Sequence, residues 1–173
     1  MKVELSSKVV ASMSVMTALV YALTAISIPM PKPLGVWHIG DIASFAAAFL
    51  CGPFVGAFAC GVGAMLFDLW NPLWGSSFIN WALPTLIIRG FMGFLLGRLR
   101  RIFPAKPRHS ELFAMVVAAV EKNIGYFIYD YYLFGPIAYL DLITFFLLST
   151  IDIIVTLPLL RLLRKALKIE YII

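Results

Sequence analysis

The chain has 173 residues, of which 62% are hydrophobic and 13% are charged. Soluble domains carry about 25% charged residues. With a mean hydropathy of +0.94, the composition therefore excludes an ordinary soluble enzyme or binding module. The net charge of +5 does not predict a nucleic-acid partner, because the Lys and Arg residues gather beside apolar segments. We predict a single integral membrane domain over residues 1–173 that binds no nucleic acid.

The first apolar segment runs from about Lys8 to Pro29. It is longer than the apolar part of a cleavable signal peptide, which has ~7–15 residues, so we predict an uncleaved first membrane span. Ser14, Ala18 and Ala22 place small residues on one face of this helix, and such faces let membrane helices approach closely. The face is explained either by packing inside the protein or by docking of a partner.

The next apolar run lies between Asp41 and Asp68 and carries no charge. As one helix it would be about 40 Å long, which exceeds the ~30 Å hydrocarbon core of a bilayer. Gly52-Pro53 lies inside the run and breaks helices, so we predict a hairpin that turns there. Residues 41–51 are too few to cross alone, so this helix either begins earlier, near Val36, or is covered by its neighbours. Asp41 is most simply its N-cap.

Further spans are predicted at about 82–99, 111–134 and 141–163, with an uncharged loop over 71–81. Two basic residues lie in the first eight positions, five in 98–108 and four in 161–168. Six spans place all of these on one side, whereas five spans would divide them and set the loops around 30–40 and 69–81 on opposite sides. The positive-inside rule therefore predicts an all-α protein with six transmembrane helices, cytoplasmic N- and C-termini and a multi-pass location in the cell (plasma) membrane.

Charged residues inside spans are costly and are functional candidates. They are Arg89, Glu121, Lys122 and Asp152, with Asp130 near an outer end. Asn123, Tyr126 and Asp130 lie at i, i+3 and i+7 and so share one helix face. This face, which Asp68 could join, predicts an outward cavity for a planar, hydrogen-bonding ligand. The alternative is a structural network, for example one in which Asp152 neutralises Lys122.

Four tryptophans are predicted at the outer side: Trp37, Trp70, Trp74 and Trp81. They form either an interfacial aromatic belt or a stacking surface for an aromatic ligand, with residues 70–81 as a lid. Cys51 and Cys60 are expected to pack as small apolar residues. His38 and His109 are predicted on opposite sides, so no histidine pair forms a metal site. Because phosphate-loop, H-E-x-x-H and G-x-S-x-G motifs are missing, we expect neither an enzyme nor an ATPase.

Three stretches carry a resemblance to a known family: HIGDIASFAAAFLCGPFVGAFACGVGAMLFDL (38–69), LIIRGFMGFLLGRL (86–99) and NIGYFIYDYYLFG (123–135). They resemble the substrate-binding (S) components of energy-coupling factor (ECF) vitamin transporters, and most closely the riboflavin-type branch. The likeness covers about residues 8–163. Arg89 stands where members commonly have lysine, and Asp130 where many have glutamate.

The resemblance implies a six-helix protein that captures a vitamin, with riboflavin favoured, at the outer face. It implies as partners a transmembrane coupling protein and two cytoplasmic ATPases, which use the ATP, while the chain itself has no cofactor. Ser14, Ala18 and Ala22 match the surface that docks the coupling protein. The candidate substrate-binding residues are Asp68, Arg89, Asn123, Tyr126, Asp130, Asp152 and Trp81.

Two other functions stay open. A structural membrane protein of the cell-shape type has similar size and helix count, and it should tolerate loss of the polar face. A stand-alone secondary transporter driven by ions would use Glu121 or Asp152 instead of a partner ATPase.

Overall fold

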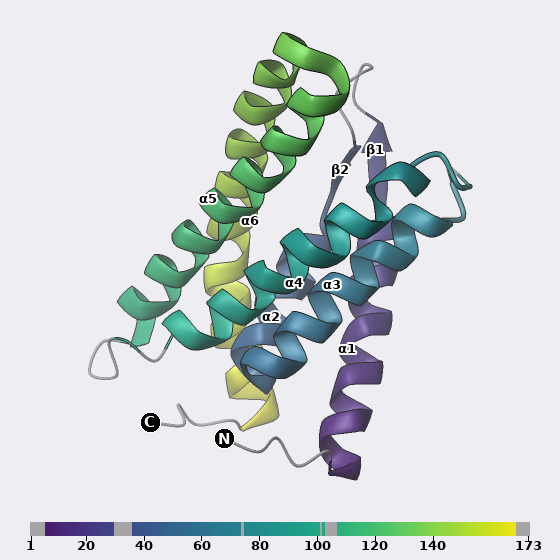
Figure 1. Cartoon of the computed structure of the whole chain (residues 1–173). Helices are drawn as coiled ribbons and strands as arrows, with labels where there is room; N and C mark the ends of the chain where they lie inside the picture. Colours follow the sequence, from purple (N-terminus) through teal and green to yellow (C-terminus); the bar gives the residue numbers. More distant parts are fainter. Residues whose placement is uncertain (1–5, 30–35, 74, 101, 103–106, 169–173) are drawn as a thin grey trace.

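The computed structural model describes residues 6–29, 36–73, 75–100, 102 and 107–168. These residues form six α-helices, two short strands and two 3-10 turns (Figure 1). In chain order they are α1 (Ser7–Ala25), β1 (Ser27–Pro29), β2 (Val36–His38), α2 (Gly40–Cys51), α3 (Pro53–Leu69), η1 (Ile79–Trp81), α4 (Ala82–Leu99), α5 (Pro107–Phe134), η2 (Gly135–Ile137) and α6 (Ala138–Leu167). The predicted all-α class is confirmed.

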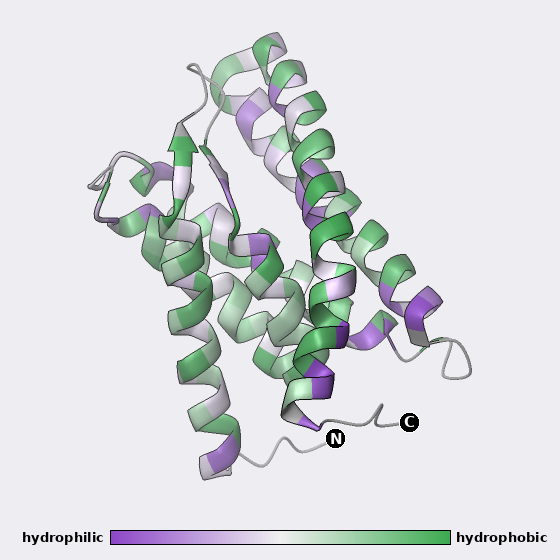
Figure 2. Ribbon diagram, turned by 180° about the vertical axis from the view of Figure 1, so that it is seen from behind, coloured by the Kyte–Doolittle hydropathy of each residue, from purple (hydrophilic) through white to green (hydrophobic). Residues whose placement is uncertain are grey.

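The helices have the length and composition of membrane elements. Within the described residues, three stretches are long and apolar enough to cross a bilayer: Ser7–Ala25, Ile79–Leu99 and Arg108–Ala166, the last of which contains both α5 and α6. The apolar helices α2 and α3 are shorter. Figure 2 shows apolar residues along the lengths of the helices and hydrophilic residues gathered near several of their ends. The chain is therefore an all-helical membrane protein.

The helix ends divide between two sides of the molecule. The first turn of α1, the end of α4, the start of α5 and the last turn of α6 lie at one end (Figure 1). The strands and the turn between α5 and α6 lie toward the opposite end. Of the charged regions that guided the topology prediction, Lys2, Lys32 and part of 98–108 fall outside the described residues.

The region after α1 differs from the prediction of a long first helix and a loop. The helix ends at Ala25, and Ser27–Pro29 pairs antiparallel with Val36–His38, with Ser27 opposite His38. Pro29 disfavours the helical conformation at Ile28, so the chain becomes extended before the proline. The short ladder then satisfies backbone groups that the helix no longer bonds.

The predicted hairpin between Asp41 and Asp68 is confirmed. α2 ends at Cys51, Gly52 adopts a φ of 91°, and α3 begins with Pro53 at its first position. A positive φ favours glycine, and proline suits the first helical turn because its missing N–H has no partner there. Since α2 begins only at Gly40, it is about 18 Å long. Most of its residues are buried, and it packs against α1, α3, α4 and α6, so its neighbours cover the short arm.

Small residues bring α3 and α4 into backbone contact. A methyl group on Gly93 would overlap the Gly56 carbonyl and would lie 2.9 Å from Cys60 Sγ. A methyl group on Gly97 would overlap the backbone of Pro53. Faces of small residues on α3 and α4 are thus packing surfaces inside the protein.

Gly93→Ala is expected to lower the free energy of unfolding by up to about 3 kcal/mol, because overpacking against backbone cannot be relieved by a side-chain rotation. Gly90→Ala on the same helix is the matched control, since its added methyl group would lie 3.6 Å from its nearest neighbour, the Ala57 carbonyl oxygen. The control should be neutral or slightly stabilising, because alanine favours helices. Thermal unfolding in detergent measures both, and equal stabilities would contradict the packing described.

A buried ionic group joins the chain segments at the end where α4 stops. Glu111 of α5 pairs with Arg164 of α6 and lies 3.9 Å from Arg100 Nε. Arg100 also donates to the Phe49 carbonyl at the end of α2. Ser110 Oγ donates to the Leu99 carbonyl at 3.1 Å. This group, which we call the Glu111 cluster, therefore connects α2, α4, α5 and α6.

Candidate functional site

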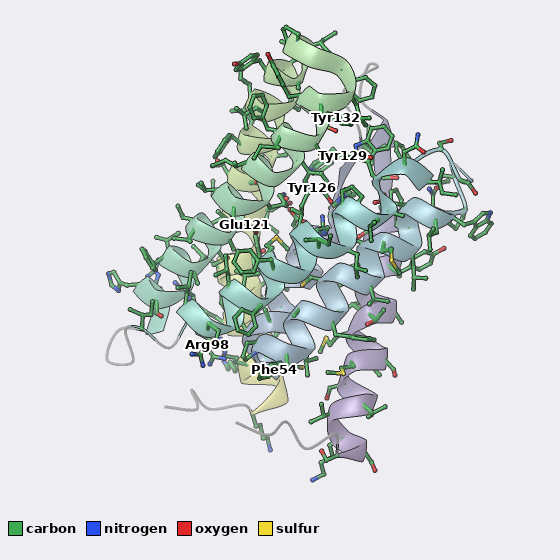
Figure 3. The ribbon with its side chains drawn as sticks, in the orientation of Figure 1. Phe54, Arg98, Glu121, Tyr126, Tyr129 and Tyr132 are labelled. Carbon is green, nitrogen blue, oxygen red and sulfur yellow. The ribbon has the colours of Figure 1, made fainter. Side chains whose placement is uncertain are left out.

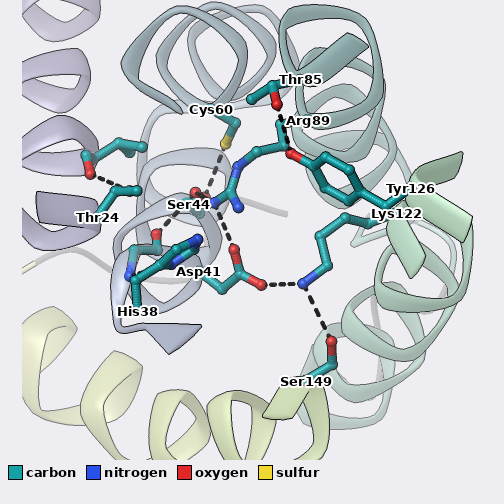
Figure 4. A network of polar contacts seen from close by, with 12 residues as sticks. Thr24, His38, Asp41, Ser44, Cys60, Thr85, Arg89, Lys122, Tyr126 and Ser149 are labelled. Carbon is teal, nitrogen blue, oxygen red and sulfur yellow. Dashed lines mark hydrogen bonds and ion pairs between the residues drawn. The ribbon is translucent and has the colours of Figure 1, made fainter. Parts of the chain in front are cut away.

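Asp41 stands between the cationic side chains of Arg89 and Lys122 (Figure 4). Its Oδ1 lies 2.5 Å from Nη2 of Arg89 on α4, and its Oδ2 pairs with Nζ of Lys122 on α5. All three residues are buried, with exposed fractions of 2%, 2% and 7%. Buried charges are costly unless paired, so this triad gives each of them a partner of opposite charge.

The β2–α2 junction places Asp41 in this position. Strand β2 ends at His38, whose Nδ1 accepts a hydrogen bond of 3.2 Å from the Gly40 N–H. Burial, and then the charge of Arg89, lower the pKa of His38 to about 3, so the imidazole is neutral and Nδ1 is free to accept. At Gly40 a methyl group would overlap the Thr24 hydroxyl of α1, so only glycine permits this approach.

The prediction that Asp41 caps α2 is wrong. The N-cap is Ile39, and no side chain caps that end. The carboxylate is occupied by Arg89 and Lys122 instead, because two buried cations attract it more strongly than helix N–H groups do.

Two serines and an amide extend the triad. Arg89 Nη2 donates to Ser44 Oγ at 3.1 Å, and Lys122 Nζ donates to Ser149 Oγ at 3.2 Å. Asn123 Nδ2 donates to the same serine at 3.2 Å. The polar network therefore takes side chains from α2, α4, α5 and α6.

The suggested pairing of Lys122 with Asp152 is also corrected, since the lysine contacts Asp41 and Ser149. Asp152 is buried on α6, and its Oδ1 has no hydrogen-bond partner in the described part of the chain. Asp152 follows Ser149, the serine that Lys122 and Asn123 share, by three positions on α6.

Thr85 of α4 lies between two further candidates. Its hydroxyl accepts a hydrogen bond of 3.0 Å from the Tyr126 hydroxyl of α5. The buried carboxylate of Asp68 on α3 interacts with the same threonine, while Asp68 Oδ2 has no hydrogen-bond partner among the described residues. Tyr126 thus connects Asp68 to the region of Arg89, whose charge also acts on its phenol.

Trp81 and Asp130 form a separate pair, with Trp81 Nε1 donating to Asp130 Oδ1 at 2.8 Å. Trp81 also stacks on Phe134, with ring centroids 5.9 Å apart. Ring contacts continue through Phe78 and Phe67 to His38. Figure 3 shows Tyr126, Tyr129 and Tyr132 following α5 toward its turn into α6, whereas Arg98 and Phe54 lie at the other end. We call the connected rings of His38, Phe67, Phe78, Trp81, Tyr129 and Phe134 the aromatic chain.

The network retains unused hydrogen-bonding capacity. Arg89 Nε and Asp152 Oδ1 are buried and lack a hydrogen bond within the described residues. Buried polar groups are normally satisfied, so such atoms are the ones a bound polar molecule would engage. In the described part of the chain, no group of three or more His, Cys, Asp or Glu is placed to hold a metal ion.

Comparison with known proteins decides the family. The family model described as "ECF-type riboflavin transporter, S component" matches residues 4–165. The chain belongs to this family. A protein of Pyrococcus woesei, described as "Uncharacterized protein in gap 3'region", is 34% identical over 111 residues, which are 64% of this chain and 70% of that protein. The resemblance to riboflavin-type S components is confirmed, and the family is one of transporter substrate-binding components rather than of enzymes.

Within this S-component fold, the predicted substrate residues fall into three groups. Arg89 belongs to the triad, Asn123 reaches it through Ser149, and Asp152 lies three positions after that serine on α6. Asp68 and Tyr126 share Thr85, and Trp81 pairs with Asp130 farther along α5. Lys122 was a functional candidate as a charged residue inside a span, but it was not among the predicted substrate-binding residues. Asp41, Ser44, Thr85 and Ser149 were not among them either. The signal for Asp41 was available: interior cations need a counterion, and an aspartate opened the next apolar run.

The tryptophans differ in burial and in the residues they contact. Trp81 is half-buried in the aromatic chain, whereas Trp70 is 58% exposed, which is typical of an interfacial belt. Trp37 is half-buried in β2, and Trp74 lies outside the described residues. Ser14, Ala18 and Ala22 are all exposed on α1, so this small-residue face, unlike that of α3, is not used for packing inside the protein.

Proposed function

We propose that this S component captures riboflavin at the outer face of the membrane. The observation that supports this most strongly is the buried network around Arg89, Asp41 and Lys122, which has unused donors and acceptors in a chain of the riboflavin family. Two cations and a carboxylate are expensive to bury at the junction of four helices. A functional site is the usual reason for such groups in a membrane protein.

The proposed binding residues suit the two parts of a flavin. The aromatic chain offers ring faces for the planar isoalloxazine system, with Trp81 and Phe134 already stacked. Asp68, Arg89, Asn123, Tyr126, Asp130 and Asp152 offer the donors and acceptors for its polar atoms. Because most of these side chains are buried, we propose that the segment around η1 moves outward to admit the ligand.

We propose that the protein lies in the plasma membrane, crosses it six times and has both termini in the cytoplasm. The shared end of α1, α4, α5 and α6 supports it, because the basic residues cluster in the segments at that end. By the positive-inside rule that end faces the cytoplasm, and the aromatic chain then lies toward the outer side.

We further propose that the chain is one part of an importer, with a transmembrane coupling protein and two cytoplasmic ATPases that use the ATP. The exposed residues Ser14, Ala18 and Ala22 are the proposed docking surface for the coupling protein. A small-residue face on a lipid-exposed helix permits close approach of a second helix.

Ala18→Leu is expected to leave riboflavin binding unchanged and to reduce ATP-dependent uptake to background, because a large side chain would hold the partner helix away. Val15→Leu is the matched control, since Val15 is exposed on the same helix but is already large. Uptake of labelled riboflavin is measured in cells that express the coupling module. Full uptake by the Ala18 variant would contradict docking through this face.

The function itself is tested by binding and uptake with and without the coupling module. The chain alone should bind riboflavin without importing it. Uptake that persists without the module and stops when the proton gradient is removed would instead support an ion-coupled transporter. The candidate proton carriers are then Glu121 and Asp152, each of which has a buried carboxylate oxygen without a hydrogen bond among the described residues. Absence of binding to any vitamin, with function retained after loss of Asn123, Tyr126 and Asp130, would support a scaffold.

A further inference from the structure

The exposed side of α6 changes from apolar to cationic near the end of the helix. Leu147, Ile151 and Ile154 are 64%, 48% and 64% exposed, as expected for a helix side that faces lipid. Arg161 lies seven positions after Ile154, and Lys165 four positions after Arg161, so the two cations continue the same side of the helix. Both side chains are exposed. The apolar surface along α6 therefore ends in basic side chains.

The position of these cations along the helix corresponds to the level of the lipid headgroups. α6 has 30 residues and is about 45 Å long, which exceeds the ~30 Å hydrocarbon core of a bilayer. Arg161 lies about 10 Å farther along the helix than Ile154. The C-cap residue, Lys168, is also exposed and follows Arg161 by seven positions. Long basic side chains near helix ends reach the headgroups while their apolar stems stay beside the lipid tails.

Contacts within the chain do not account for these three cations. In the last turns of α6 it is Arg164 that pairs with the buried carboxylate of Glu111. The ion pairs among the described residues do not include Arg161, Lys165 or Lys168. The helix dipole favours cations within the last turn, but Arg161 lies more than one turn before the end of the helix. The three positive charges are therefore available to a partner outside the chain.

We propose that Arg161, Lys165 and Lys168 form a binding site for the phosphate group of an anionic phospholipid in the cytoplasmic leaflet. Basic clusters that directly follow a membrane helix on its cytoplasmic side attract anionic lipids. The guanidinium and ammonium N–H groups donate to the phosphate oxygens, while Leu162, which is 65% exposed beside Arg161, contacts the tails of the same lipid. The inference rests on the proposed orientation in the membrane, and it goes beyond riboflavin capture.

A lipid suits this surface better than an acidic protein does, because the cations continue a side of α6 that is apolar and exposed over several turns. A lipid offers both chemistries in the same order along the membrane normal, with apolar tails first and then an anionic phosphate. A free phosphate ion would use only the cationic part of the surface.

The test compares an anionic with a neutral lipid that has identical tails. The full-length protein in uncharged detergent is titrated with dioctanoyl phosphatidylglycerol or dioctanoyl phosphatidylcholine, and the bound lipids are counted by native mass spectrometry. The wild type should bind the anionic lipid about 10- to 100-fold more tightly, since each cation near an anionic headgroup contributes about 5-fold. Inorganic phosphate at the same concentration should not displace the lipid. Displacement would show a site for free anions and would overturn the inference.

Removal of the three charges should reduce the preference for the anionic lipid to about 2-fold or less. The variant combines Arg161→Gln, Lys165→Gln and Lys168→Gln. The matched control removes three exposed cations from the same end of the molecule, one each from α1, α4 and α5: Lys8→Gln, Arg98→Gln and Arg108→Gln. The control should keep most of the preference, because its cations do not share one helix side. Both variants should keep the wild-type melting temperature and riboflavin affinity, because all six side chains are exposed.

Equal affinity of the wild type for the two lipids would overturn the inference. An equal loss of preference in the two triple variants would also overturn it, because the lipid would then respond to overall charge and not to a site on α6. Neither result bears on riboflavin capture. Failure of the wild type to bind riboflavin would overturn the proposed function, and the lipid site would be judged by its own titration.

Discussion

Replacement of Arg89 by methionine is expected to abolish measurable riboflavin binding and to lower the free energy of unfolding by about 3 kcal/mol. The substitution keeps the length of the side chain but removes the charge that pairs with Asp41 and the donor that bonds Ser44. Asp41 would keep Lys122 as a partner. The loss of stability should therefore stay near the lower end of the range for a broken buried ion pair. Isothermal calorimetry and thermal unfolding in detergent measure the two effects.

Arg98→Met on the same helix is the control for this prediction, because Arg98 is exposed near the end of α4 (Figure 3). It should change stability by no more than about 0.5 kcal/mol and should leave binding unchanged. Arg89→Lys should recover part of the stability, since it restores the charge without the planar guanidinium. Wild-type affinity in Arg89→Met would show that the triad is a structural ion pair only.

Glu111→Gln is expected to destabilise the protein by about 3 kcal/mol while leaving the riboflavin affinity of the folded protein unchanged. The substitution leaves the buried Arg164 guanidinium without its carboxylate partner and weakens the connection between the start of α5 and the end of α6. The Glu111 cluster and the triad lie at different levels of the assembly, so their effects should be independent. Unfolding and calorimetric titration are again the measurements.

Arg164→Met should match Glu111→Gln in stability, because each removes one member of the same pair. Arg161→Met is the control: Arg161 lies one turn earlier on α6 and is exposed. A loss of affinity in Glu111→Gln without a loss of stability would contradict the separation of the two ionic groups.

The sequence predicted much of the fold because the dominant signals were local. Long apolar runs and the Gly52-Pro53 break predict α3, α4 and the hairpin. The helix predicted over 82–99 has the same bounds as α4. The strand pair β1–β2 was not predicted. Its three-residue strands carry no alternating pattern, and they form because the chain must reach the buried start of α2.

The sequence predicted several residues of the candidate site, but not which side chains each of them contacts. Helical spacing placed Asn123, Tyr126 and Asp130 on one face, but the structure joins them to three different neighbours: Ser149, Thr85 and Trp81. Asp41 pairs with Lys122, which is 81 positions away in sequence. Such pairing depends on how α2 packs among four helices, and neither composition nor periodicity contains that information.

Riboflavin binding is tested most directly by titrating the purified chain with riboflavin in the absence of any partner protein. Because the aromatic chain brings Trp81 to the proposed site, bound flavin should quench tryptophan fluorescence. We expect one riboflavin to bind per chain, quenching to be reduced in Trp81→Phe, and binding to be lost in Arg89→Met. No change in fluorescence or heat at riboflavin concentrations up to the millimolar range would contradict it.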